Sequence, residues 1–367
     1  MVNLSDSDKI HASEKLYMAD DYRDPFSLLI RIFTHGYLLR DRFDIINKYS
    51  PYNFTNHKDE IPKPFDEYTS FHEVADRIAT EMLSKYKTIG VSWSGGVDST
   101  TVVCVLLNNL PPTEYHRIKV ICSESSIEEY PLFYRLLNKL QVPIVLTNDM
   151  VETMRNIDVD CITSGWCADQ LYGHDIHQQN LSLYNKPYME GIVEIWNQFF
   201  PNDKLSQAEI DSIDAMVKEY SSALGLNVEQ FCEFAWMYNF GVKMSYVRER
   251  LPMHLFGSKN EGKVEHFYHH KLLQQWAMSN FKNIRVHNGY KDTIYYKQHA
   301  KQYILEFTHD GNYFKNKIKR NSWYMLGELK NGVHVLTDNG LKIFKAKSTN
   351  NLEAIGRLVS KKFLKKN

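Results

Sequence analysis

The chain has 367 residues, with 44 basic and 44 acidic side chains and a formal net charge of zero. This length gives one large domain or two with an ample core, and the charge balance does not indicate a nucleic-acid or membrane surface. No apolar run reaches the ~18–20 residues of a membrane-spanning helix, and the polar start does not resemble a signal peptide. The five cysteines are scattered without a Cys-x-x-Cys pair, which fits a reduced, cytoplasmic protein without a zinc site.

Residues 1–70 are predicted to form a small N-terminal region. The apolar runs at 26–33 and 36–39 predict two short strands or a strand and a helix, and Pro51, Pro62 and Pro64 mark an irregular connection. The region is shorter than an amidotransferase domain, and it has no cysteine near its start that could act as an N-terminal nucleophile. We therefore expect no glutaminase domain in this chain.

From residue 71 the pattern predicts a core of alternating strands and helices, beginning with an amphipathic helix at 71–86. Because the strands are apolar and alternate with helices, we expect a doubly wound parallel α/β sheet. In such sheets ligands bind at the carboxyl ends of the strands. The expected strands are 88–93, 117–123, 143–147 and 158–163, and the helical segments between them are 98–109, 130–140 and 150–155.

Residues 91–100 combine a strand end, a turn of small residues and a helix start, with the sequence Val-Ser-Trp-Ser-Gly-Gly-Val-Asp-Ser-Thr. This order aims backbone N–H groups and the positive end of a helix dipole at one anion. The glycines let the backbone approach closely, and Asp98 suits Mg²⁺ that bridges phosphates. A plain glycine turn between a core strand and a core helix is the alternative.

The Ser-Gly-Gly-x-Asp-Ser string resembles the PP-loop of the ATP pyrophosphatases, which cleave ATP between its α and β phosphates. It lacks the lysine of the Walker loop. The resemblance implies adenylation of a substrate, with ATP and Mg²⁺ as cofactors and AMP and pyrophosphate as products. It also implies an adenosine contact at Ser123, although residues 123–126 are equally compatible with a solvated loop. The residues assigned to ATP are Val91, Ser92, Ser94, Gly95, Gly96, Asp98, Ser99, Thr100 and Ser123.

A second motif follows the fourth strand at 164–173, with the sequence Ser-Gly-Trp-Cys-Ala-Asp-Gln-Leu-Tyr-Gly. It is expected at the same sheet edge as the first loop. Asp169 could then give Mg²⁺ a second carboxylate beside Asp98, since Mg²⁺ favours one or two carboxylates plus phosphate oxygens. The alternative is a helix-capping aspartate at a strand exit.

Beyond about residue 176 the pattern becomes helical, with amphipathic spacing at 207–223, 228–250 and 268–280. At 321–347 the period changes and two Asn-Gly dipeptides separate apolar runs, which predicts a small β-meander. The basic tail after Lys361 is a solvated helix end or a contact for an anionic partner.

Together the two motifs resemble the synthetase domain of the asparagine synthetase family, which includes the β-lactam synthetases. The corresponding signature of that family is Ser-Gly-x-Gly-Ala-Asp-Glu-Leu-Phe-Gly. The resemblance implies an adenine nucleotide α-hydrolase-like fold and a ligase that adenylates a carboxylate and transfers the acyl group to ammonia or an amine. Gly165 and Trp166 then join the ATP site. The expected organisation is 1–70, a synthetase core at 71–285, and a C-terminal region at 286–367.

The resemblance also implies a catalytic lysine, because Lys317-Ile318-Lys319 is similar to the family's Arg-x-Lys loop. Lys319, with Lys317 next, would offset charge that develops on the adenylate. Surface lysines are the alternative, since Lys315 and Arg320 stand in the same stretch. Lys243 lies where the family has a buried lysine on a helix.

Several positions depart from the pattern of asparagine synthetases, among them His174 and Asp175, which replace Gly-Tyr. Trp166 replaces the glutamate of asparagine synthetases and is closer to the β-lactam synthetase pattern, in which the nucleophile is not free ammonia. Cys167 replaces a glycine, and its thiol is either a small core group or a nucleophile. Gln170 replaces a glutamate. The carboxylate and the nucleophile, which could come from a second substrate or a separate ammonia-supplying protein, therefore stay open.

Two other functions are kept as alternatives. The chain could be a PP-loop enzyme that adenylates a nucleobase or nucleotide in nucleic-acid modification, where the aromatic side chains would stack on the base. It could also be a non-catalytic regulator that binds a nucleotide. The enzyme is favoured because the chain retains Ser94, Asp98, Ser99 and Asp169 together.

Overall fold

The computed structural model describes residues 42, 43, 45, 48, 61–173, 181–199, 202–284, 297–317, 333–337 and 340–344. The predicted elements at 26–33 and 36–39, the first strand of the predicted meander and Lys319 lie outside these residues. None of the helices in the described ranges is both long enough and apolar enough to cross a membrane.

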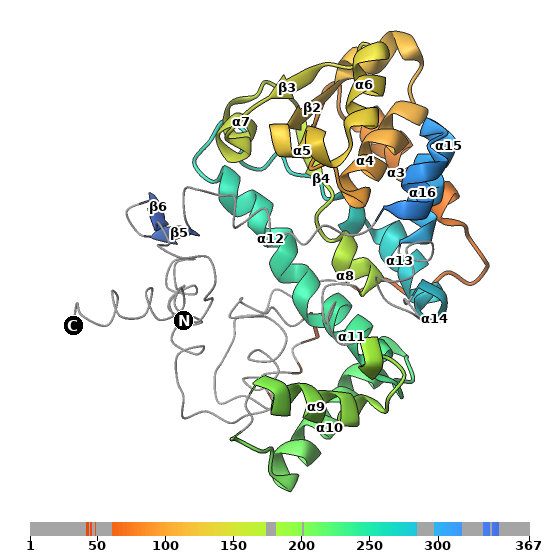
Figure 1. The fold of residues 1–367 in the computed structure, drawn as a ribbon, viewed down its shortest axis with the longest axis vertical. Helices are drawn as coiled ribbons and strands as arrows, with labels where there is room; N and C mark the ends of the chain where they lie inside the picture. Colours follow the sequence, from red (N-terminus) through yellow and green to blue (C-terminus); the bar gives the residue numbers. More distant parts are fainter. Residues whose placement is uncertain are drawn as a thin grey trace.

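The α/β part of the molecule, in the upper half of Figure 1, is built on a parallel sheet of four strands in the order β3-β2-β1-β4. This confirms the predicted α/β fold and is compatible with a doubly wound sheet. Strand β1 pairs with β2 on one side and with β4 on the other. The chain therefore adds β2 and β3 on one side of β1 and β4 on the other. The strands are β1 (Ile89–Ser92), β2 (Ile118–Cys122), β3 (Ile144–Leu146) and β4 (Cys161–Ser164).

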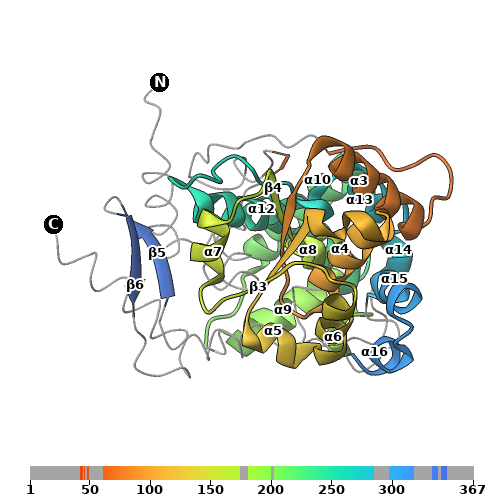
Figure 2. The same cartoon turned by 90° about the horizontal axis from the view of Figure 1, so that it is seen from above.

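Helices cover both faces of the sheet. Successive residues of each strand point to opposite faces, so each face packs against its own set of helices. Val91 and Val120 pack on the side of α4 (Val97–Asn108), and α3 (Phe71–Lys85) packs outside that helix. Ile121 and Ile162 face α7 (Met150–Asn156) and α12 (Met244–Leu255). Figure 2 shows the strands between α7 and α4. The burial of both faces explains the nearly continuous apolar runs of the strands.

The second, helical part begins within the second motif, at α8. The helix predicted at 228–250 is two helices, α11 and α12, joined by a π-helical turn at Asn239–Lys243. Arg42 fixes this turn, because its Nη1 donates to the carbonyl of Phe240 at 3.2 Å and its Nη2 to Gln274 Oε1 at 2.6 Å. The helices of this part are α8 (Ala168–Tyr172), α9 (Tyr188–Phe199), α10 (Gln207–Leu224), α11 (Phe231–Tyr238), α13 (Lys271–Ser279) and α14 (Phe281–Ile284).

Two short helices follow β2, of which the first was not predicted and the second confirms the helix expected at 130–140. Residues 123–126 start a helix, α5 (Glu124–Glu129), rather than forming a loop, because the Ser123 side chain caps its N-terminus. Helix α6 (Pro131–Lys139) follows, with Pro131 in its first turn as predicted. Short 3₁₀ turns lie at Pro112–Arg117, Leu181–Leu183 and Phe267–His269.

The C-terminal region contains two helices that the pattern did not predict, α15 (Gln298–Thr308) and α16 (Gly311–Asn316). Helix α15 packs against α4, and α16 packs against α15. This places α15 and α16 on the side of the sheet that carries α4 (Figure 1). Strands β5 (Val333–Thr337) and β6 (Gly340–Phe344) form an antiparallel hairpin, which confirms two strands of the predicted meander.

Candidate functional site

The loop between β1 and α4 is held in a tight turn by its own residues. Gly95 has φ +79°, and a Cβ at this position would lie 2.4 Å from the carbonyl oxygen of Ser126, so only glycine fits. The backbone N–H of Ser94 donates to Ser99 Oγ at 3.0 Å. Gly96 is the N-cap of α4 and has no side chain to cap the helix. The loop therefore presents backbone and hydroxyl donors at a helix N-terminus, as an anion site requires.

Some of the residues predicted to bind ATP are buried, or use their side chains in contacts within the protein. Val91 is buried in the sheet. Thr100 is also buried, and its Oγ1 accepts a hydrogen bond from Trp93 Nε1 at 2.9 Å. Ser92 lies at the end of β1 and is partly exposed. Ser123 follows the neighbouring strand β2, so it is at the same sheet edge, but its hydroxyl caps α5. Val91 and Thr100 thus support the loop from within.

The second motif touches the first loop directly. A Cβ at Gly165 would lie 2.6 Å from the backbone nitrogen of Ser99 and 2.9 Å from Asp98 Cβ, so glycine allows the two loops to meet. Ser164 pairs in register with Ser92, so β1 and β4 end at the same level. The contact lies between β1 and β4, the neighbouring strands at which the strand order reverses. Open α/β sheets bind ligands at such a point.

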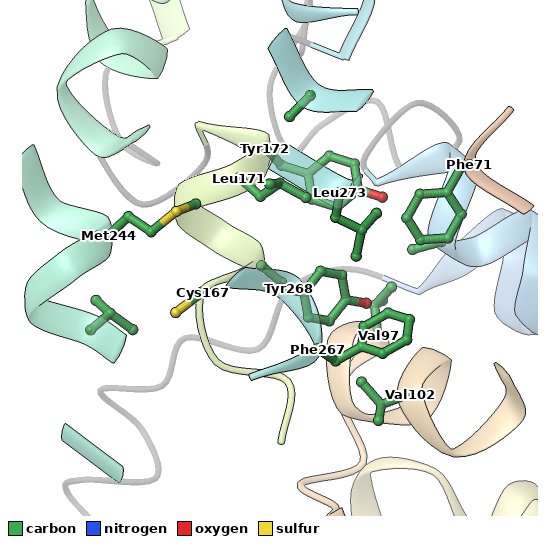
Figure 3. Close-up of a cluster of buried hydrophobic side chains, with 14 of the residues drawn as sticks. Phe71, Val97, Val102, Cys167, Leu171, Tyr172, Met244, Phe267, Tyr268 and Leu273 are labelled. Atoms are coloured by element: carbon green, nitrogen blue, oxygen red, sulfur yellow. The ribbon is translucent and has the colours of Figure 1, made fainter. Parts of the chain in front are cut away.

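Cys167 has a left-handed backbone, with φ +72° and ψ −8°, at the N-cap of α8. This conformation favours glycine, which the asparagine synthetase signature has at this position, and costs a residue with a side chain about 1 kcal/mol. The thiol is buried among apolar side chains that include Tyr268 and Met244 (Figure 3). Its place in the core supports the role of a small apolar residue.

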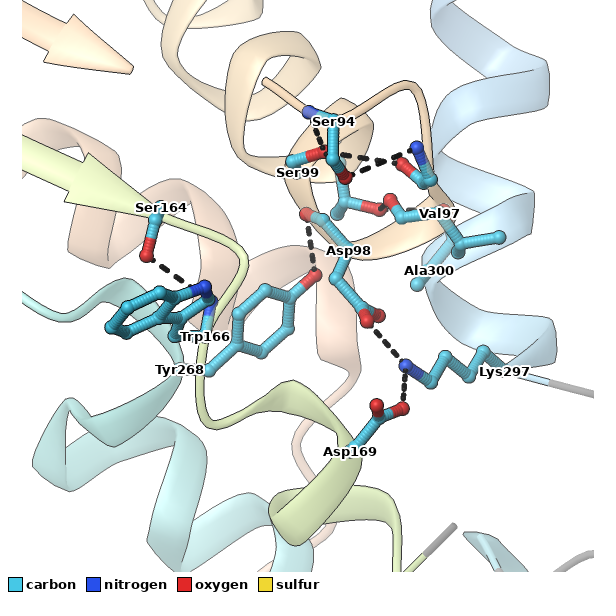
Figure 4. Close-up of polar contacts among 12 residues, drawn as sticks. Ser94, Val97, Asp98, Ser99, Ser164, Trp166, Asp169, Tyr268, Lys297 and Ala300 are labelled. Atoms are coloured by element: carbon cyan, nitrogen blue, oxygen red, sulfur yellow. Dashed lines mark hydrogen bonds and ion pairs between the residues drawn. The ribbon is translucent and has the colours of Figure 1, made fainter. Parts of the chain in front are cut away.

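The two predicted metal ligands, Asp98 and Asp169, converge as expected, but a lysine lies between them (Figure 4). Lys297 Nζ lies 2.6 Å from Asp169 Oδ1 and also donates to Asp98 Oδ2. The lysine side chain is 0% exposed, and the side chains of the two aspartates are 22% and 24% exposed. The site is thus a cluster of three charged groups that opens to solvent on the aspartate side.

Electrostatics explain why this lysine stays charged. Burial disfavours the ammonium form of Lys297, but the carboxylates of Asp169 and Asp98 outweigh burial and raise its pKa above the ordinary value. Tyr268 completes the surroundings, because its hydroxyl donates to the backbone carbonyl of Asp98 at 3.2 Å. Burial and then the charge of Asp98 raise the pKa of Tyr268 well above its usual range, so it is a neutral donor.

The donor set of Asp98 and Asp169 fits Mg²⁺, which takes hard oxygen ligands and is commonly held by one or two carboxylates together with substrate phosphates. Within the described part of the chain, no group of three or more acidic, histidine or cysteine side chains could enclose a metal. Mg²⁺ at the two carboxylates would therefore need further ligands from phosphate or water. Lys297 would have to share or give up its contacts there.

Lys317, the second candidate for the catalytic cation, is directed to the first loop. It follows α16 and forms an ion pair with Glu129, and the two side chains are 9% and 8% exposed. Glu129 Oε1 lies 3.9 Å from the position a Cβ on Gly96 would take. This excludes the surface-lysine alternative for Lys317. Lys319, the first candidate, is outside the residues described.

The side of the site away from α16 is aromatic and basic. The guanidinium carbon of Arg250 lies 5.3 Å from the ring centroid of Trp166, and the His254 ring packs edge-on at 5.9 Å. Both residues come from α12. Trp166 is therefore fixed by cation–π and aromatic contacts at the mouth of the second loop. Lys243, predicted as buried, is buried in the π turn.

Sequence patterns missed Lys297 and Glu129. Lys297 stands in no motif and lies 199 residues from Asp98 along the chain. The two side chains meet because α15, which follows Lys297, packs against α4. Glu129 is one of several acidic residues after β2, and only its contact with Gly95 distinguishes it. No local signal identifies either residue.

Neither models of known protein families nor the curated proteins gave a match to this chain.

Proposed function

We propose that the protein is an ATP-dependent ligase that adenylates a carboxylate, releases pyrophosphate and transfers the acyl group to an amine or ammonia. The observation that carries the proposal is the convergence of Asp98, Asp169 and Lys297 between two loops that leave β1 and β4 at the same sheet edge. A loop suited to anions, with one aspartate from each of the two motifs and a buried cation beside it, suits a nucleoside triphosphate with its metal. The proposal includes an adenine nucleotide α-hydrolase-like fold and a cytoplasmic location.

The residues of the first loop would bind the phosphates. Backbone N–H groups at the start of α4, with the Ser94 and Ser99 hydroxyls, supply hydrogen bonds and the positive end of the helix dipole. Asp98 and Asp169 would hold Mg²⁺, which neutralises phosphate charge when bound. Lys297 and Lys317 carry positive charge to two sides of the loop. Donors fixed before the reaction lower the cost of charge that develops on pyrophosphate.

The acceptor side differs from an ammonia site. Trp166 carries no carboxylate that could handle ammonia, and its ring contacts Arg250 and His254 of α12. We propose that the acyl acceptor is a small molecule with an amine, and that its binding surface includes the exposed part of Trp166. The carboxylate substrate would lie between this ring and the α-phosphate of ATP.

The test is an ATP–pyrophosphate exchange screen with Mg²⁺ against amino acids, amino-sugar acids and nucleotide carboxylates. We expect exchange with the correct carboxylate, and AMP and pyrophosphate in full turnover. Asp98→Asn should abolish exchange, whereas Asp158→Asn, the same change at an exposed residue, should not alter it. Release of ADP and phosphate would contradict the proposal.

Two outcomes would support other functions. Exchange with a nucleobase or nucleotide alone would favour an enzyme of nucleic-acid modification. ATP binding without AMP formation across the whole screen would favour a nucleotide-binding regulator. The engagement of both carboxylates by Lys297 is compatible with such a regulator, because an internal cation could replace the catalytic metal.

A further inference from the structure

The ion pair between Glu129 and Lys317 lies against the loop that is proposed to bind phosphates. A Cβ at Gly95 would lie 2.8 Å from Glu129 Cβ and 3.2 Å from its Cγ, so the glutamate packs directly on the loop. Its carboxylate lies beside Gly96 and accepts a hydrogen bond from the ammonium of Lys317. An acidic side chain is thus fixed beside an anion site.

Both ends of this ion pair are held by short helices. Glu129 closes α5, whose start is fixed by a capping box between Ser123 and Ser126. Lys317 follows α16, which Tyr313 attaches to the start of α6 by stacking on Tyr130 with ring centroids 3.9 Å apart. These contacts fix the two backbones. The lysine ammonium, at the end of a four-carbon stem, can still move between neighbouring anions.

The negative charge of Glu129 is unfavourable for phosphate binding at the adjacent loop, so its presence there calls for a functional explanation. A carboxylate near bound pyrophosphate repels it, and within a largely buried site this repulsion is stronger than in water. Glu129 also engages the cation that would otherwise bind the phosphate. Both effects weaken anion binding. Weak binding is useful for a product that must leave.

We propose that Glu129 competes with pyrophosphate for Lys317 and thereby promotes the release of pyrophosphate. This inference rests on the proposed function. Lys317 exchanges between the carboxylate of Glu129, when the phosphate site is empty, and the phosphate oxygens, when it is filled. No covalent bond changes in the exchange. Glu129 is a positioning residue that acts through the lysine.

Removal of the negative charge of Glu129 should therefore increase the affinity for pyrophosphate. Glu129→Gln keeps the size of the residue but removes its charge, so Lys317 loses its competing partner and the repulsion of pyrophosphate disappears. A hydrogen bond to a charged group is strong enough to change an affinity by one order of magnitude or more. We therefore expect this variant to bind pyrophosphate about tenfold more tightly. A purely structural role predicts the opposite, since a damaged loop binds anions less well.

The experiment is calorimetric titration of the full chain with pyrophosphate and Mg²⁺, and separately with ATP and Mg²⁺. Glu129→Gln should lower the Kd for pyrophosphate about tenfold and slow its dissociation by a similar factor, measured by chase with unlabelled pyrophosphate. Glu128→Gln, the same change at the exposed neighbour, should have no effect. Lys317→Met should weaken binding. In the Lys317→Met background, Glu129→Gln should give no more than about a twofold gain, because the cation for which they compete is gone.

The possible failures are distinct. Wild-type protein that binds ATP and pyrophosphate, with a Glu129→Gln variant that binds pyrophosphate equally or less well, overturns this inference and leaves the proposed function intact. Absence of binding in the wild type and in every variant overturns the proposed function and this inference with it. A tenfold gain that persists without Lys317 shows repulsion alone and overturns the competition. If Glu129→Gln does not fold, Glu129→Asp retains the charge on a shorter stem, and a smaller gain in affinity is expected.

Discussion

Replacement of Lys297 by Met removes the cation between two carboxylates and leaves them facing each other. The two oxygens contact one nitrogen, so they lie at most about 5 Å apart, and at an effective dielectric constant of about 20 they repel by about 3 kcal/mol. Loss of one partner of a buried ion pair costs roughly 3–5 kcal/mol, and we expect the lower end because the aspartate side chains are 22% and 24% exposed. The free energy of unfolding should therefore fall by about 3 kcal/mol at pH 7.

The pH of the measurement follows from the direction of the pKa shift. The carboxylates raise the pKa of Lys297 above its ordinary value, despite its burial, so this stabilisation is fully present below the pKa of an unfolded lysine. It is lost only in strongly alkaline solution, as the pH rises through the folded pKa. At pH 7 the contribution of the lysine is therefore complete.

The assay is urea denaturation of wild-type and Lys297→Met protein with and without Mg²⁺. If the two carboxylates hold Mg²⁺, the ion should restore part of the lost stability, about 1.4 kcal/mol at a concentration ten times the Kd, and should affect the wild type less. Lys301→Met is the matched control, since Lys301 is also buried on α15 but donates to a backbone carbonyl at 3.4 Å. Its loss of stability should not respond to Mg²⁺. A Lys297→Met protein as stable as the wild type would refute the electrostatic argument, and equal Mg²⁺ effects in all three proteins would refute the metal site.

Three further predictions concern other residues. Gly165→Ala places a Cβ 2.6 Å from the backbone of the first loop, so it should cost roughly 1–3 kcal/mol in denaturation experiments and abolish ATP binding, whereas Gly311→Ala, which meets nothing within 4 Å, should be tolerated. Burial lowers the pKa of His266 to about 4, so the unfolded chain binds a proton as the pH falls from about 6.5 to 4 while the folded chain does not. The wild type should therefore lose about 2 kcal/mol more than His266→Gln between pH 7 and pH 5. Lys317→Met should reduce ATP–pyrophosphate exchange about a hundredfold, and a larger loss with Lys319→Met would assign the main catalytic charge to Lys319.

The order of elements in the core could be predicted because its signals are local. The strand at 88–93 and the helix at 98–109 were found at Ile89–Ser92 and Val97–Asn108. Apolar runs bounded by turn residues are set by burial on both faces of the sheet. The helices at 298–308 and 311–316 were missed, because α15 contains charged and aromatic residues whose burial depends on packing against α4.

The two loops could be identified from the sequence alone, since small residues with positive φ or close backbone contacts leave a recognisable string around Gly95 and Gly165. The sequence also indicated that Asp98 and Asp169 face each other, because parallel strands end at one edge. Which side chains lie between and beside these residues depends on the packing of distant helices. Lys297 and Lys317 reach the loops from the far end of the chain through helix packing. Charged groups brought together by packing leave no periodic signal, because their attraction depends on distance in space and not along the chain.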